Sequence, residues 1–248
     1  MMTFSALGRY GRLGNQMFQV ASTIGIARKY GREFAFPKWV NHDQQVRFNI
    51  ADDYYIGNHL LRPLPEWDGT PYPEHFMHWG YSDLFVPDNV DLTGHMQSEK
   101  YFKHCEDEIR YYLKFWQQLQ YSPPFTALHV RMGDYGSDYH PICPPEYYYN
   151  AVKITGSQKI MLFSDEPDRA SAYLPEIKFH TIHRGNTIDA MHNMISCKKH
   201  IIANSTFSWW GAWLSHKPEC VVAPKQWFGP AASHLETKDI YPDNWIII

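Results

Sequence analysis

The stretch that decides the fold is residues 125–135, which read Phe-Thr-Ala-Leu-His-Val-Arg-Met-Gly-Asp-Tyr. Its first six residues, mostly apolar, predict a buried strand from Phe125 to Val130. The stretch follows Ser122-Pro123-Pro124, the clearest internal break in the chain. It ends in an arginine, a glycine and an aspartate, which predict a loop directly after the strand.

Beyond this stretch, strands and helices alternate. The predicted strands are 159–163, 178–180, 200–203 and 220–223, and the predicted helices are 145–154, 167–173, 187–196 and 205–215. Before the break, the predicted strands are 4–7, 33–36 and 91–96, and the predicted helices are 15–30 and 105–119. Such alternation is typical of parallel sheets covered by helices. The sequence therefore predicts an α/β protein of two halves, residues 1–123 and 124–248.

Composition excludes several classes of protein. Of the 248 residues, 44% are hydrophobic and 20% are charged, and the formal net charge is −3. The hydrophobic fraction is enough to form a core. Because the net charge is negative, the sequence does not predict a nucleic-acid partner. Residues 1–20 contain no apolar run of signal-peptide length, and no window approaches 18 consecutive apolar residues. We therefore expect no membrane span and a cytoplasmic location; the oligomeric state stays open.

Ligands of parallel sheets bind beyond the carboxyl ends of the strands, which selects four loops. The first is residues 11–18, Gly-Arg-Leu-Gly-Asn-Gln-Met-Phe, where glycines allow close approach of the backbone to a ligand. The spacing is not that of the dinucleotide fingerprint. A tight turn between a strand and a helix is the alternative interpretation.

The second loop, residues 129–135, contains Arg131 and Asp134, and the third, residues 163–166, contains Asp165 and Glu166. Arg131 stands where a guanidinium can clamp a diphosphate, and an ion pair with Asp134 is the alternative. In the third loop, Asp165 suits a ribose hydroxyl or a guanine edge. Capping of the following helix by Ser164 or Asp165 is equally consistent with the local sequence.

The fourth loop, Asn204-Ser205-Thr206, lies where a strand becomes a helix. Its hydroxyl groups and backbone N–H groups predict an anion site, and the tryptophans that follow it are predicted to be core. The sequence contains no D-x-D triplet and no cysteine spacing typical of zinc sites. Together the four loops favour a nucleotide diphosphate held without metal.

The same loops resemble the α-1,2-fucosyltransferase family. The resemblance is carried by residues 11–18, 129–135, 163–165 and 204–214, with support from 97–102 (Gln-Ser-Glu-Lys-Tyr-Phe), 223–228 (Ala-Pro-Lys-Gln-Trp-Phe) and 241–245 (Tyr-Pro-Asp-Asn-Trp). It implies a GT-B fold, in which two Rossmann-like halves face each other across a cleft. It also implies inverting transfer of L-fucose from GDP-β-L-fucose to the 2-hydroxyl of a galactose on a glycan acceptor, with no cofactor and no metal.

The resemblance and the loops together give the candidate residues. The donor-binding candidates are Gly14, Asn15, His129, Arg131, Ser164, Asp165, Asn204, Ser205, Thr206 and Phe207. The catalytic candidates are Arg131, Asn15 and Asp134. The acceptor-binding candidates, all in the half predicted to hold the acceptor, are His78, Trp79, Asp83, His95 and Glu99. Asp134 is the first candidate for a base that deprotonates the acceptor, with Glu99, His129 and His95 as alternatives.

Two other functions stay open on the sequence. One is a different GDP-sugar enzyme of the same fold, such as an α-1,6- or protein O-fucosyltransferase. The other is a catalytically silent protein that binds a carbohydrate or a nucleotide.

Overall fold

The computed structural model describes residues 1–9, 11–37, 39, 70–71, 80–83, 85–113 and 125–248. It divides into two units, Met1–Lys114 with Leu235–Pro242, and Phe115–His234 with Asp243–Ile248. The predicted boundary at 123/124 lies outside the described residues. Leu235–Pro242, which the sequence analysis places in the second half, groups with the first unit. There Lys100 Nζ lies 2.5 Å from Asp239 Oδ1.

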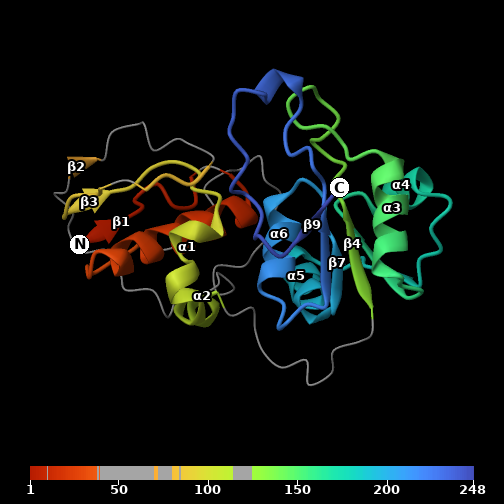
Figure 1. Ribbon diagram of the computed structural model, residues 1–248, viewed down its shortest axis with the longest axis horizontal. Helices are drawn as coiled ribbons and strands as arrows, with labels where there is room; N and C mark the ends of the chain where they lie inside the picture. Colours follow the sequence, from red (N-terminus) through yellow and green to blue (C-terminus); the bar gives the residue numbers. More distant parts are fainter. Residues whose placement is uncertain (10, 38, 40–69, 72–79, 84, 114–124) are drawn as a thin grey trace. The chain divides into compact units, whose positions relative to one another are not determined.

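The second unit is built on a six-stranded parallel sheet (Figure 1). Its strands are β4 (Thr126–Val130), β5 (Ile160–Ser164), β6 (Thr181–Ile182), β7 (Lys199–Ile201), β8 (Cys220–Ala223) and β9 (Ile246–Ile247). The order across the sheet is β6-β5-β4-β7-β8-β9, and every neighbouring pair is parallel. The predicted parallel α/β sheet is confirmed.

Helices cover both faces of this sheet (Figure 1). They are α3 (Pro145–Thr155), α4 (Pro167–Tyr173), α5 (Thr187–Ser196) and α6 (Thr206–Trp213). Leu128 and Val130 pack toward α3 and α4, whereas Ala127 packs with Met194 of α5. This alternation is what a strand buried on both faces requires. The tryptophans of α6 are core as predicted, with Trp209 and Trp210 fully buried.

The strand order distinguishes one position in this sheet, the one between β4 and β7. Chain progression runs outward from β4 in one direction through β5 and β6, and from β7 in the other through β8. The order is that of the dinucleotide-binding fold, and β4 and β7 flank the point where it reverses. Connections leave toward opposite faces at such a point, which opens a crevice at the carboxyl ends of the two strands.

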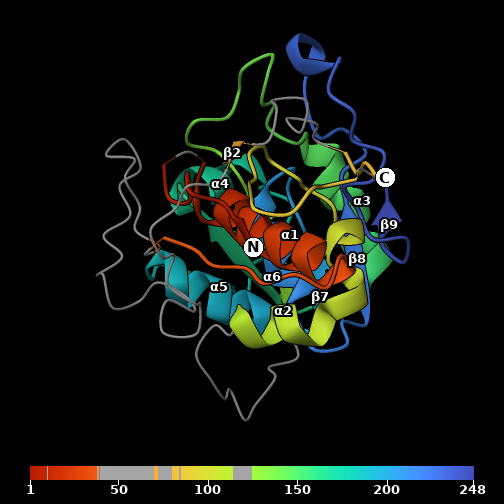
Figure 2. The same cartoon turned by 90° about the vertical axis from the view of Figure 1, so that its left-hand side faces the viewer.

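The first unit contains a small parallel sheet of order β1-β3-β2 (Figure 1). Its strands are β1 (Met2–Thr3), β2 (Thr70–Pro71) and β3 (Val90–Asp91), and α1 (Leu13–Lys29) is its long helix (Figure 2). Two 3-10 turns, η3 (Glu99–Tyr101) and η4 (Lys103–Cys105), precede α2 (Glu106–Tyr112). Arg28 of α1 holds Glu108 of α2 through two hydrogen bonds of 2.8 and 2.6 Å.

Three predicted strands of this unit were wrong in position or extent. The first strand is Met2–Thr3 rather than 4–7, because Leu7 N–H bonds the Phe4 carbonyl and forms a turn there. Residues 33–36 contain isolated bridge residues at Phe34 and Phe36 rather than a strand, and Phe34 pairs with Met2. The strand predicted at 91–96 ends at Asp91, since Gly94 and Met96 have positive φ angles of 119° and 47°. The part of the predicted helix 105–119 beyond residue 113 lies outside the described residues.

Across the described residues, no helix combines the length and apolar character needed to cross a membrane.

Candidate active site

Arg131 follows β4 and lies between two carboxylates. Its Nη1 is 2.8 Å from Asp165 Oδ2, and its Nη2 donates to Asp134 Oδ1. The Arg131 side chain is 12% exposed, against 50% for Asp134 and 23% for Asp165. The ion pair with Asp134 is the alternative that the sequence analysis left open. The planar guanidinium is therefore held in place from two sides at the crevice of the sheet.

Asp165 is fixed by the strand pairing below it. Val130 and Ser164 are register partners, so the residues that follow them emerge side by side. Asp165 Oδ1 accepts from the Met132 backbone N–H at 3.0 Å. A side chain at position 133 would clash with Asp165 Oδ2, so this close approach requires Gly133. The structure thus gives Asp165 a role in orienting Arg131; contact of Asp165 with guanosine stays a prediction.

Ser164 stabilises the same turn, because its Oγ accepts a hydrogen bond from the Glu166 N–H at 3.1 Å.

The fourth loop enters α6 at the other side of the crevice. Ser205 is the N-cap residue, and its hydroxyl makes no capping bond. Thr206 and Phe207 form the first turn of the helix, whose N-terminal end carries a partial positive charge. Asn204 differs from the prediction, because its side chain is buried and bonded within the protein. Its Nδ2 donates to the carbonyls of Pro141 and Trp227, each at 3.0 Å. The Asn204 side chain therefore fastens the loop, and residues 205–207 remain the candidates for the predicted anion site.

Tyr135 joins the two loops, a role that the sequence analysis did not assign. Its hydroxyl donates to the Asn204 carbonyl at 2.9 Å, and the Arg131 guanidinium carbon lies 5.4 Å from its ring centre. The ring also stacks on His140 at 5.0 Å. Tyr135 thus connects the arginine after β4 to the residue before the α6 N-cap.

Replacing Tyr135 by phenylalanine keeps the ring under Arg131 and removes the bond to Asn204. One neutral hydrogen bond contributes about 1 kcal/mol, so we expect kcat/KM for the donor to fall about fivefold. Steady-state kinetics of Tyr135→Phe measure this, and Tyr139→Phe, an exposed neighbour, is the control. Equal kinetics for the two variants would contradict a positioning role.

His129 and Phe207 meet beneath the crevice, with ring centres 5.9 Å apart. His129 is 5% exposed, and burial lowers its pKa to about 4 although the nearby Asp165 opposes this shift. A neutral, buried imidazole of such low basicity is a poor general base at neutral pH. This geometry favours packing of His129 over its role as the acceptor base.

In the first unit, the glycine loop and α1 place Gly14 and Asn15 at the start of the helix. Gly11 has a φ of +75°, and a side chain there would lie 2.7 Å from Asn15 Cβ. Asn15 Oδ1 accepts from Gln97 Nε2 at 3.1 Å, which joins the first loop to the stretch at 97–102. The positive φ of Gly11 and the close approach of Asn15 Cβ therefore both require glycine at position 11.

Among the acceptor-binding candidates of the first unit, Asp83 and Glu99 each pair with a different lysine. Asp83 bonds Lys29 at the surface, and Glu99 lies 3.3 Å from Lys103. Burial lowers the pKa of His95 to about 4, which argues against this residue as the base. His78 and Trp79 lie outside the described residues.

The arrangement in the second unit suits one kind of ligand. A fixed guanidinium after β4, and a helix N-terminus with the Ser205 hydroxyl after β7, flank the switch point, and together they are donor groups of the kind that bind a diphosphate.

The comparisons with known proteins agree with this chemistry. The family model described as glycosyl transferase family 11 matches residues 5–248. The chain is 29% identical to an α-1,2-colitosyltransferase of Escherichia coli, with 96% of each chain covered. It is 36% identical to the O-antigen biosynthesis glycosyltransferase WbnK of Escherichia coli over 49% of this chain and 43% of that protein.

Among solved structures, the NodZ α-1,6-fucosyltransferase co-crystallised with GDP matches with a TM-score of 0.50 and 14% identity, over 85% of this chain and 91% of that one. The fucosyltransferase NodZ from Bradyrhizobium matches with a TM-score of 0.50 and 13% identity, over the same shares. These likenesses identify the fold as the GT-B type.

Proposed function

The chain belongs to glycosyl transferase family 11, and from that premise we propose that it moves L-fucose from GDP-β-L-fucose to the 2-hydroxyl of a galactose on a glycan, with inversion at the sugar carbon. The observation that carries this proposal is the placement of Arg131 and the α6 N-terminus at the switch point between β4 and β7. A leaving nucleoside diphosphate develops negative charge, and fixed donors at that place stabilise it as the glycosidic bond breaks.

Arg131 would receive the phosphate by exchanging one partner for another. Asp134 is half exposed, and exposed ion pairs contribute at most about 1 kcal/mol, so a phosphate replaces it at small cost. Asp165 is less exposed and also bonded to Met132, so it would keep the guanidinium oriented after the exchange. Once released, the Asp134 carboxylate would be available to take the proton of the acceptor hydroxyl.

The α6 N-terminus would hold the second phosphate. Ser205 supplies a hydroxyl that no capping bond uses, and the first turn of α6 begins directly after it. The helix dipole adds a partial positive charge at the same end. In this proposal Gly14 and Asn15, at the start of α1 in the first unit, also bind the donor.

A second candidate donor has support from the comparison that covers both chains almost fully. The relative matched over 96% of each chain is named for transfer of colitose, which is fucose without its 3-hydroxyl. A donor panel with GDP-fucose and GDP-colitose on a β-galactoside acceptor, with linkage analysis of the product, separates the two. Transfer of fucose to the galactose 2-hydroxyl supports the first candidate, and transfer of colitose alone supports the second. No product with either donor, on any galactoside, contradicts both.

We expect turnover to persist in excess EDTA. The sequence lacks the D-x-D triplet that holds a metal against a diphosphate in other glycosyltransferases, and Arg131 supplies positive charge in its place. Initial rates with GDP-fucose, before and after dialysis against chelator, measure this. Loss of turnover that Mg²⁺ or Mn²⁺ restores would overturn the metal-free proposal.

A further inference from the structure

Gln97 is a buried amide side chain of the first unit, with 1% of its surface exposed. Its Nε2 donates to Asn15 Oδ1 at 3.1 Å, so the two amides meet with a donor against an acceptor. Rotation of the Asn15 amide by half a turn would set one NH2 group against the other, and neither group can accept a hydrogen bond. Gln97 therefore holds the Asn15 amide in one of its two orientations.

The nitrogen end of the Asn15 amide lies over the glycine loop. A side chain at Gly11 would place its first carbon 2.8 Å from Asn15 Nδ2, so this nitrogen lies on the side of the loop that the glycine leaves open. An amide NH2 group donates hydrogen bonds and does not accept them. A ligand that reaches Asn15 Nδ2 therefore has to offer an acceptor oxygen, as a phosphate or a sugar does.

The glycine loop is fixed by a second amide. Trp39 Nε1, which can only donate, bonds Gln16 Oε1 at 2.6 Å, and Gln16 Nε2 donates to the Gly11 carbonyl at 2.8 Å. Gln16 and Trp39 are both buried. Because a shift of the loop would break these buried hydrogen bonds, the loop cannot follow an Asn15 side chain that turns away. The direction of the Asn15 amide then depends on Gln97.

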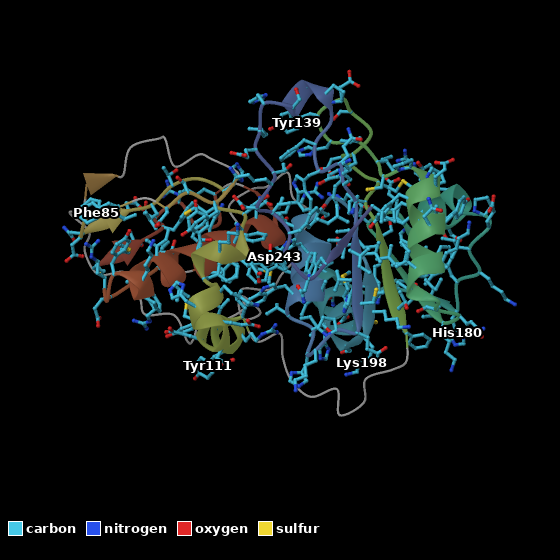
Figure 3. All side chains as sticks on the ribbon, in the orientation of Figure 1. Phe85, Tyr111, Tyr139, His180, Lys198 and Asp243 are labelled. Atoms are coloured by element: carbon cyan, nitrogen blue, oxygen red, sulfur yellow. The ribbon has the colours of Figure 1, made fainter. Side chains whose placement is uncertain are left out.

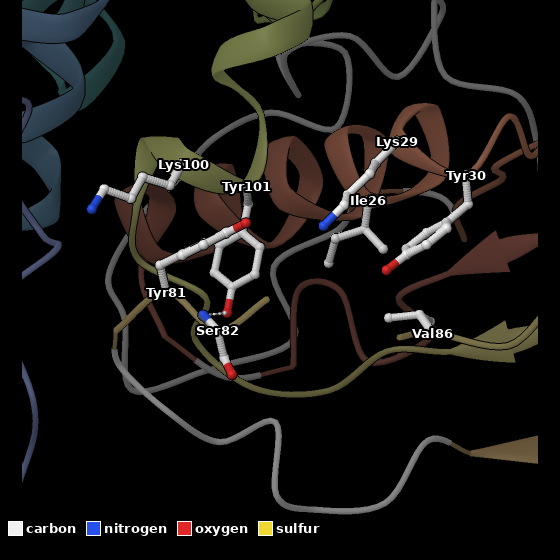
Figure 4. Close-up of a pocket in the computed structure, with 8 residues that line it drawn as sticks. All are labelled: Ile26, Lys29, Tyr30, Tyr81, Ser82, Val86, Lys100 and Tyr101. Carbon is white, nitrogen blue, oxygen red and sulfur yellow. Dashed lines mark hydrogen bonds between the residues drawn. The ribbon is translucent and has the colours of Figure 1, made fainter. Parts of the chain in front are cut away.

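The stretch that carries this glutamine is docked on α1 by contacts of its own. Ser22 Oγ donates to the Met96 carbonyl at 2.9 Å, and a side chain at Gly25 would clash with the Tyr101 carbonyl. Farther along α1, the Tyr101 hydroxyl accepts from the Ser82 N–H at 3.1 Å (Figure 4). These contacts hold the stretch in place without using the Asn15 side chain, so loss of the amide pair is expected to leave the fold intact.

We propose that Gln97 is a positioning residue for the transfer reaction, and that it fixes the Asn15 amide so that Nδ2 donates to an oxygen of the GDP-fucose donor. The inference rests on the proposed function, in which Asn15 binds the donor. Gln97 itself touches no substrate in this account, and its effect passes through Asn15.

Gln97→Met tests this role, because it keeps the length of the side chain and removes the N–H donor. We expect kcat/KM for GDP-fucose to fall about fivefold, which is the scale of one hydrogen bond. Ser22→Ala is the matched control, since it removes a buried hydrogen bond between the same stretch and α1. Tyr111→Ala, which removes an exposed ring of α2 (Figure 3), is the surface control. Both controls should retain the kcat/KM of the wild type.

The decisive comparison repeats Gln97→Met in an Asn15→Ala protein. If Gln97 acts through Asn15, no further loss occurs there, because the effects of two residues that act together are not additive. An equal loss in both backgrounds, or no loss in the wild-type background, would overturn the positioning role. If thermal unfolding shows that Gln97→Met is not folded, Gln97→Asn gives the same comparison, since it keeps a buried amide but is one methylene too short to reach Asn15.

Calorimetric titration with GDP-fucose, without an acceptor, separates this inference from the proposed function. If no fucose is transferred to any galactoside, but Gln97→Met weakens GDP-fucose binding about fivefold only when Asn15 is present, the proposed function fails and the role of Gln97 stands. If fucose is transferred, but GDP-fucose binds equally well to the wild type and to Gln97→Met and their kcat/KM values agree, the proposed function stands and the role of Gln97 is overturned.

Discussion

Replacing Arg131 by alanine is expected to lower kcat about 100-fold or more while the protein stays folded. The guanidinium is the fixed positive group at the switch-point crevice, and one such contact to developing charge contributes roughly 3 kcal/mol to the barrier. Arg131→Lys should recover only part of the activity, because an ammonium cannot bond Asp165 and a phosphate with the planar fork of arginine.

Steady-state kinetics with GDP-fucose, together with thermal unfolding of each variant, measure this effect. Arg169→Ala is the matched control, since Arg169 belongs to the same unit and pairs with Glu166 at the surface. Near-normal turnover of a folded Arg131→Ala protein would mean that the diphosphate is held elsewhere.

The second large effect is a loss of stability in mild acid. Burial lowers the pKa of His129 and of His200 to about 4, against about 6.5 for an unfolded chain. Below pH 6.5 the unfolded state takes up protons that the folded state does not accept. The free energy of unfolding therefore falls as the pH drops from about 6.5 toward 4. Between pH 7.5 and 5 each histidine contributes a loss of about 2 kcal/mol.

Urea unfolding at pH 7.5 and pH 5 measures this loss. His200→Leu should reduce the difference between the two pH values by about 2 kcal/mol, since it removes one of the histidines, His95, His129 and His200, whose pKa burial lowers to about 4. His216→Gln is the control, because His216 is exposed. An identical pH dependence of wild type and His200→Leu would contradict the account of this histidine.

How much of the fold could be predicted differs between the two units. Strand β8 and helices α4 and α5 match their predicted bounds, because prolines and polar residues mark the ends of elements there. In the first unit, Phe4 and Leu7 are buried in a turn rather than in a strand. Apolar residues indicate that a segment is buried, but a buried turn and a buried strand can be equally apolar. Strand β9 is two residues long and gives no periodic pattern.

The sequence could group the candidate residues of the site, but it could not predict the contacts between them. Loops at the carboxyl ends of parallel strands share one edge, so the sequence could gather Arg131, Asp165 and Ser205. The contact of Tyr135 with the Asn204 carbonyl depends on β4 lying beside β7, and the order of strands in a sheet is not written in any local pattern. The sequence could not decide between the two interpretations of Asp134, because a carboxylate three residues after an arginine can either pair with it or face a ligand; the structure pairs it with Arg131.

The central claim is that the donor diphosphate binds at the crevice between β4 and β7. A crystal structure of the protein with GDP tests it most directly. The account predicts one phosphate on the Arg131 guanidinium in place of Asp134, and the other within hydrogen-bonding distance of Ser205 and the first-turn N–H groups of α6. GDP bound at another place, with Arg131 still paired to Asp134, would contradict it.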